Sequence, residues 1–150
     1  MILVDTGPLV ALFDPQDGQH ARCVRILRRI REPIITTIPV LTEAFHMLGP
    51  ASLGSDRLRE FIEGGGLSVW FFERTALTRA CELMEGYADH PMDLADASLV
   101  AAAESLGARQ VFTIDRKDFE TYRVRRGHRH QAMEIVSSPA FNVKPKSWPR

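Results

Sequence analysis

The chain opens with Met1-Ile2-Leu3-Val4-Asp5-Thr6-Gly7-Pro8, in which an apolar run leads directly into a carboxylate. An apolar run of this kind is typical of a buried strand, and Gly7-Pro8 ends it. Asp5 is therefore predicted to lie where a strand gives way to a helix, at the edge where open α/β sheets bind ligands. Taken alone, Asp5 is better interpreted as the N-cap of that helix. A functional site is indicated only if other carboxylates arrive at the same edge.

The composition is that of an ordinary globular domain, with 150 residues, 45% hydrophobic and 25% charged. This length predicts a single domain over 1–150, with a proline-containing tail at 137–150. The sequence has no long apolar span and no basic region followed by an apolar core, so we expect a cytoplasmic protein without a membrane segment. Cys23 and Cys81 lie in apolar helical patterns and are expected to be buried, reduced thiols.

The formal net charge of zero hides an uneven distribution. Residues 1–107 carry 9 basic and 15 acidic side chains, whereas residues 108–150 carry 10 basic and 4 acidic ones. This segregation is a weak indication of a polyanionic partner. Folding can mix the two sets, so the charge pattern alone decides nothing.

Strand patterns alternate with helical patterns along the chain. After the opening, the predicted strands are 34–38, 67–72, 111–114 and 132–136. The predicted helices are a short turn at 9–13, then 20–31, 39–48, 56–63 with Ser55 as its N-cap, 75–87 and 93–106. This alternation predicts an α/β fold, a three-layer α/β/α domain with a mostly parallel central sheet.

Two further acidic residues are notable for their position. Glu43 lies in the first turns of the predicted helix 39–48, and by itself it is better interpreted as facing solvent. Asp115 repeats the arrangement of Asp5, because it follows an apolar strand directly. A turn or cap role is the simpler interpretation for Asp115 as well.

Asp93 and Asp96 open the predicted helix 93–106. Beyond its first turn this helix is nearly apolar on all sides, which indicates burial. Asp93 is best interpreted as its N-cap, with Asp96 a first-turn acid favoured by the helix dipole. That interpretation is weaker for Asp96, because an unpaired charge one turn into a buried helix is costly.

All five carboxylates are predicted to lie at a strand C-terminus or a helix N-terminus, which form the same edge of a parallel sheet. Carboxylates gathered at one edge repel one another, and a hard divalent cation would relieve that repulsion. An oxygen-only set with no converging cysteine or histidine favours Mg²⁺ or Mn²⁺ over zinc.

These residues resemble the PIN domain, and within it the toxin ribonucleases of bacterial and archaeal toxin–antitoxin pairs (VapC-like). The matching pieces follow the family's order and spacing: residues 2–9, the Glu43 helix, 93–101 and 112–119. The resemblance implies that one or two Mg²⁺ or Mn²⁺ ions are held by Asp5, Glu43, Asp96 and Asp115.

The same resemblance implies supporting roles for three neighbours. Thr6 and Thr113 would position water or a ligating carboxylate, and Asp93 matches a position that is acidic in some members. For the RNA backbone, Arg116 and Lys117 are the nearest candidate contacts. A denser basic group lies on a predicted loop or edge strand and comprises Arg123, Arg125, Arg126 and Arg129. None of the five histidines is expected to pair with the carboxylates.

The function implied is metal-assisted hydrolysis of RNA phosphodiester bonds by a toxin that a cognate antitoxin protein neutralises. Such toxins commonly form homodimers. An alternative is a non-catalytic PIN-like nucleic-acid-binding module, against which the intact set of four carboxylates argues. A phosphatase of the haloacid dehalogenase type is rejected, because it needs a second Asp where this chain has Gly7.

Overall fold

The computed structural model describes residues 1–136, so the expected tail at 137–150 lies outside the described part of the chain. Five strands form the central sheet: β1 (Ile2–Val4), β2 (Ile34–Thr37), β3 (Ser68–Trp70), β4 (Gln110–Phe112) and β7 (Glu134–Ile135). Their order is β3-β2-β1-β4-β7, and every pairing is parallel. Because β1 is the central strand, the residue that follows it, Asp5, lies at the middle of the carboxyl edge.

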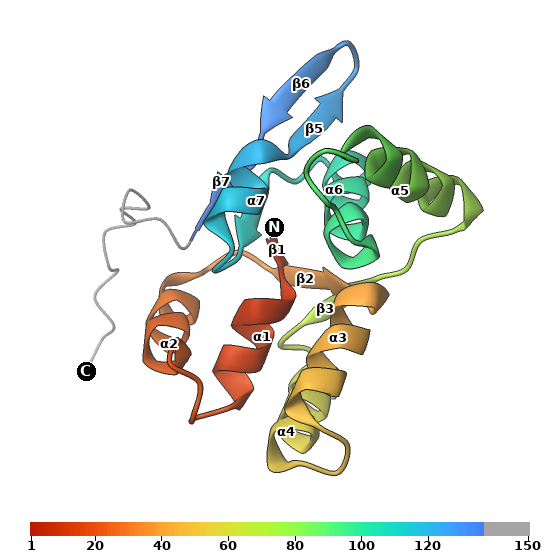
Figure 1. The fold of residues 1–150 in the computed structure, drawn as a ribbon. Helices are drawn as coiled ribbons and strands as arrows, with labels where there is room; N and C mark the ends of the chain where they lie inside the picture. The colour runs from red at the N-terminus through yellow and green to blue at the C-terminus, as the bar shows by residue number, and fades with distance from the viewer. Residues whose placement is uncertain (137–150) are drawn as a thin grey trace.

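Helices cover the sheet on two sides (Figure 1). The connections from β1 through β2 to β3 contain α1 (Thr6–Phe13), α2 (His20–Arg29), α3 (Ile38–Leu48) and α4 (Leu53–Glu63). The return from β3 to β4 contains α5 (Arg74–Gly86) and α6 (Leu94–Leu106) on the other side. Right-handed crossovers require this change of side, because the chain reverses its direction across the sheet after β3. The predicted three-layer α/β/α architecture is confirmed.

The core lies between β1 and α6. All three residues of β1 are fully buried, and the described helix α6 is buried on nearly all sides from Ala95 to Ala103. The expectation that this helix is buried is therefore confirmed, and its alanines allow close packing against the sheet and α5. Within residues 1–136, no helix has both the length and the apolar character needed to cross a membrane.

The basic segment expected to be a loop or edge strand is a separate antiparallel hairpin. Its strands are β5 (Arg123–Arg126) and β6 (Arg129–Ala132), which pair with each other and not with the central sheet. The hairpin follows α7 (Arg116–Thr121), and fully buried Val124 anchors it along α6. In Figure 1 its tip projects from the body of the molecule. The predicted strand 132–136 is thus two elements, the end of β6 and the separate strand β7.

Two predictions about local structure are wrong. Helix α4 begins three residues earlier than expected, because Ser52 is its N-cap and accepts a hydrogen bond from Ser55 N at 3.0 Å. Ser55 instead donates its hydroxyl to the carbonyl of Gly49 at 2.7 Å. Both cysteines are free, as expected, but only Cys23 is buried, whereas Cys81 is exposed on α5.

Candidate active site at the carboxyl edge of the sheet

Asp5 uses both of its carboxylate oxygens within the fold. One oxygen accepts a hydrogen bond from Thr6 N at 2.8 Å and so caps α1. The other accepts a hydrogen bond from the hydroxyl of Thr113 at 2.8 Å. The side chain is only 7% exposed. Asp5 is therefore the N-cap of α1, as interpreted from the sequence, but only one of its two oxygens serves as the cap.

Two threonines, Thr113 and Thr6, connect Asp5 with two of the other predicted acids. Thr113, which is fully buried, accepts a hydrogen bond from Asp115 N at 2.9 Å while donating to Asp5. Thr6 donates its hydroxyl to Glu43 Oε2 at 2.8 Å. Glu43 is half-buried and faces this site, so the interpretation that it faces solvent is wrong. The ends of β1 and β4 and the start of α3 are thereby joined.

Asp96 reaches the same edge from the start of α6. Asp93 is the N-cap of this helix and accepts a hydrogen bond from Asp96 N at 2.8 Å, as predicted. The carboxylate of Asp96 accepts a further hydrogen bond from the hydroxyl of Tyr122 at 2.8 Å. Tyr122 is fully buried and follows α7 directly. Its hydroxyl therefore restrains the Asp96 carboxylate.

Burial dominates the electrostatics of the two most enclosed acids. It raises the pKa of Asp5 to about 6, against the lowering effect of the hydrogen bonds from Thr113 and Thr6, and the charges of Asp115 and Asp93 raise it further. These mutual influences indicate that acids from separate elements share one neighbourhood.

Asp96 behaves in the same way. Burial raises its pKa to about 7, the charge of Asp93 adds to this, and the charges of Asp5 and Asp118 contribute less. The hydrogen bond from Tyr122 opposes the rise. Within residues 1–136, neither Asp5 nor Asp96 forms an ion pair with a lysine or arginine, so the site concentrates negative charge.

Asp118 and His90 also belong to this neighbourhood, and sequence reasoning missed both. Asp118 donates its backbone N–H to Asp115 Oδ1 at 3.3 Å, and its carboxylate lies 2.7 Å from His90 Nε2. Burial raises the pKa of Asp115, and the side chain and charge of Asp118 add to the rise, whereas the backbone hydrogen bond from Asp118 opposes it. The spacing of Asp118 from Asp115, typical of a first helical turn, was a usable signal. His90 had none, because it lies 28 residues from Asp118 in the sequence.

The carboxylates lie in one neighbourhood but do not form a complete metal-binding site. In the described part of the chain, no three Asp, Glu, His or Cys side chains are close enough to hold a metal ion as they stand. Drawing them onto one cation requires side-chain movement. The two predicted RNA contacts lie in the first turn of α7, where Arg116 forms an ion pair with Glu120 at 3.1 Å and Lys117 is exposed.

The sheet order and the carboxyl-edge acids agree with a known family. The model of the PIN domain matches residues 2–125. The chain belongs to the PIN-domain family. A curated relative, Ribonuclease VapC26 of Mycobacterium tuberculosis, is 25% identical over 126 residues, covering 81% of this chain and 92% of that protein.

Solved structures give the same fold. The crystal structure of Mycobacterium tuberculosis VapC20, described as a sarcin-ricin loop cleaving toxin, matches this PIN domain with a TM-score of 0.71. The two sequences are 18% identical, and the match covers 77% of this chain and 90% of VapC20. The resemblance to VapC-like PIN domains is thereby confirmed. The family match ends at residue 125, inside β5, so the turn and return strand of the hairpin lie beyond it.

Proposed function

We propose that this PIN-domain protein is a Mg²⁺- or Mn²⁺-dependent endoribonuclease and the toxin of a type II toxin–antitoxin pair. The observation that carries the proposal is the linkage of Asp5 to Glu43 through the backbone N–H and hydroxyl of Thr6, and to the backbone of Asp115 through the Thr113 hydroxyl, at the edge that Asp96 also reaches. The ribonuclease and toxin descriptions of VapC26 and VapC20 support the substrate class and the biological role.

The donor set fits a hard divalent cation. The residues that would hold it are Asp5, Glu43, Asp96 and Asp115, all of which offer carboxylate oxygens. Burial and mutual repulsion raise the pKa of Asp5 and of Asp96, so their negative charges are poorly compensated in the protein itself. A divalent cation would supply the missing positive charge. When bound, it would also lower the pKa of its water and offset charge that develops on the phosphoryl group.

The protein's own contribution is orientation. Thr113 and Thr6 restrain Asp5 and Glu43 through their hydroxyl hydrogen bonds, and Tyr122 restrains Asp96. The carboxylates of Asp5, Glu43 and Asp96 are therefore held by the fold before any cation binds. Restraint of this kind reduces the reorganisation needed when substrate arrives.

Substrate and protein partners complete the proposal. Arg116 and Lys117, next to Asp115, would contact RNA phosphates, which positions the strand without selecting bases. A cognate antitoxin would neutralise the enzyme. A homodimer is supported by three apolar side chains near the carboxyl edge, Ile38, Phe71 and Leu94, which are 45%, 71% and 37% exposed. Light scattering of the purified protein and of Phe71→Ser tests the dimer, and an unchanged monomer in both would contradict it.

The decisive experiment is RNA cleavage by purified protein with Mg²⁺, with Mn²⁺ and with excess EDTA, followed by mapping of the cut ends. Asp5→Asn and Asp96→Asn should abolish cleavage. The matched control is Asp56→Asn, which neutralises an exposed acid on α4 paired with Arg59 and should cleave normally. Full cleavage in EDTA, or by both site variants, would overturn the proposal. RNA binding that survives both substitutions, with no turnover under either cation, would identify a non-catalytic module instead.

A further inference from the structure

The β5–β6 hairpin carries more positive charge than its fold requires. Residues 123–132 contain four arginines and two histidines and no acidic residue. In the hairpin register Arg126 faces Arg129. Like charges directly opposite each other destabilise an antiparallel pair. The hairpin is therefore a surface on which an anionic partner would relieve repulsion.

Two of the four arginines have structural roles. Arg126 donates to the carbonyls of Ala103 and Ala108 at 2.9 and 2.6 Å, at the end of α6. Arg123 donates to the carbonyl of Glu120 at 2.6 Å, at the end of α7. Arginines that cap helix C-termini in this way stabilise the fold.

The other two arginines are available. Arg125 and Arg129 are exposed, and within residues 1–136 neither guanidinium forms a hydrogen bond or an ion pair. Arg125 uses only its backbone N–H, which it donates to Glu104 at 3.0 Å. The hairpin thus presents two uncommitted guanidinium groups to solvent.

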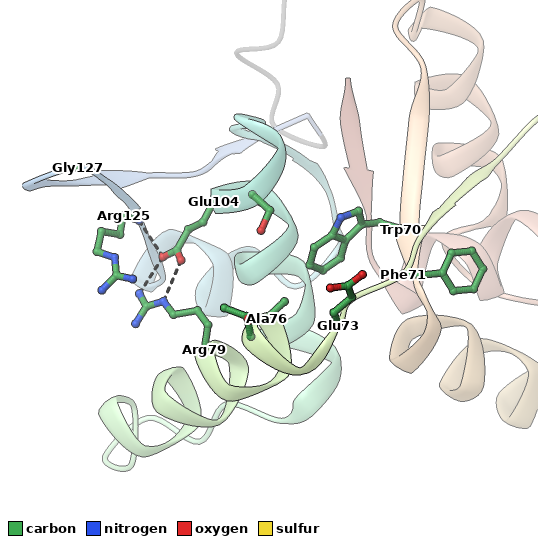
Figure 2. A pocket seen from close by; sticks show the side chains of 10 residues that line it. Trp70, Phe71, Glu73, Ala76, Arg79, Glu104, Arg125 and Gly127 are labelled. Atoms are coloured by element: carbon green, nitrogen blue, oxygen red, sulfur yellow. Dashed lines mark hydrogen bonds and ion pairs between the residues drawn. The ribbon is translucent and has the colours of Figure 1, made fainter.

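A groove adjoins the hairpin, with a volume of about 610 Å³. Arg125 and Glu104 lie at one end, where Arg79 neutralises Glu104 at 2.8 Å (Figure 2). Burial alone would raise the pKa of Glu104, but its hydrogen bonds, chiefly from Arg79, lower it overall, so the pair stays ionic. Arg125 also lowers the pKa of Glu104 through its charge, so this end of the groove carries two guanidinium groups, from Arg79 and Arg125, around one lining carboxylate.

The opposite end of the groove is aromatic. Figure 2 shows the indole of Trp70 directed into the groove, with the carboxylate of Glu73 beside it and the small side chain of Ala76 between the two ends. Glu73 therefore lies away from the end where Arg125 would attract an anion. A cation at one end and a flat aromatic face at the other suit a nucleotide, with its phosphate and its base at opposite ends.

We propose that the hairpin and this groove bind single-stranded RNA outside the cleavage site, with Arg125 and Arg129 contacting phosphates and Trp70 stacking against an unpaired base. Tyr122, which binds Asp96, immediately precedes β5, so the hairpin is joined directly to a residue of the candidate active site. Single-stranded RNA is commonly recognised by such a combination of basic side chains and aromatic stacking. The inference rests on the proposed ribonuclease function and adds a second contact region to it.

Binding of a fluorescently labelled, mixed-sequence single-stranded RNA in EDTA tests the inference without cleavage. Arg125→Gln/Arg129→Gln should bind about tenfold more weakly, and the slope of log affinity against log salt should flatten by about 1.4, or about 0.7 for each lost phosphate contact. The matched control is Arg25→Gln/Arg29→Gln, which removes the same charge from two exposed positions on α2, away from the hairpin in Figure 1. Equal losses from both double variants, or no loss from the hairpin variant, would overturn the inference.

Tryptophan fluorescence gives a second, direct readout. The sequence has two tryptophans, so Trp148→Phe leaves Trp70 as the only one. Saturating RNA should quench its emission if a base stacks on the indole, and unchanged emission would exclude the stacking contact. The two proposals fail separately. Absence of metal-dependent cleavage with normal hairpin-dependent binding would refute the nuclease alone, whereas cleavage with hairpin-independent binding would refute the second contact region alone.

Discussion

Replacing Asp5 by Asn should stabilise the metal-free protein at neutral pH. Burial raises the pKa of Asp5 from 3.8 to about 6, so the folded protein holds this proton more tightly than the unfolded chain. The free energy of unfolding therefore falls as the pH rises from about 4 to above 6. At 1.36 kcal/mol for each pKa unit, the loss amounts to about 3 kcal/mol.

Asn removes this charge at a smaller cost. Its carbonyl oxygen can still accept from Thr6 N, but its amide group faces the Thr113 hydroxyl, which must give up the hydrogen bond it donated to Asp5. The lost hydrogen bond costs about 1 kcal/mol. The variant should therefore be more stable than the natural sequence by about 2 kcal/mol at pH 8, although it should not cleave RNA.

Urea unfolding in EDTA between pH 4 and pH 8 measures this directly. The natural protein should lose stability across that range. Asp5→Asn should lose less, because only the loss of stability caused by Asp96, with its pKa of about 7, remains. Mn²⁺ at pH 8 should restore stability to the natural protein and not to the variant. Asp56→Asn is the control and should follow the natural protein. A variant no more stable than the natural protein at pH 8 in EDTA would refute the account of Asp5.

Three further substitutions test individual contacts. Tyr122→Phe removes the hydrogen bond to Asp96 and should lower the cleavage rate about tenfold, which is equivalent to about 1.4 kcal/mol. A titration in EDTA should show unchanged RNA binding. Thr113→Val leaves Asp5 and the Asp115 N–H without a buried partner and should cost about 2 to 3 kcal/mol in urea unfolding, whereas Thr113→Ser should recover most of it. Gly7→Ala places a Cβ 2.6 Å from Ile114 Cγ1, and because that side chain must shift, the melting temperature should fall by an amount equivalent to about 1 kcal/mol.

The sequence predicted the parts of the fold that depend on local pattern. An apolar run identified β1, a β-branched run identified β2, and the run Val111-Phe112-Thr113-Ile114 identified β4, because a parallel sheet covered on both sides buries both faces of its strands. The acids Asp5 and Asp115 could be placed at one edge for the same reason, since parallel strands end together. Asp93 could be identified as an N-cap from its position before a buried helix.

The contacts that complete the site could not be predicted. The hydrogen bond of Tyr122 to Asp96 joins positions 26 residues apart, and hydrophobic periodicity reveals which face is buried without revealing which partner it meets. The pairing of His90 with Asp118 could not be predicted for the same reason, because these residues also lie far apart in the sequence. The hairpin was hidden because β5, with Val124 as its one apolar residue, shows almost no alternation. Ser55 was predicted as the cap of α4, but Ser52 has the extended backbone of an N-cap and accepts a hydrogen bond from Ser55 N.

Three of the carboxylates at the sheet edge are also N-caps, namely Asp5 for α1, Asp93 for α6 and Asp115 for α7. Under the proposed nuclease function, these positions would be selected both for the chemistry of the site and for the first turn of a helix. A descendant that abandons RNA cleavage gains nothing from the charge but still needs the cap, and Asn or Ser provides one where Ala does not. Inactive homologues that descend from such a nuclease should carry Asn or Ser at these three positions, so the residues found there would identify them as former enzymes.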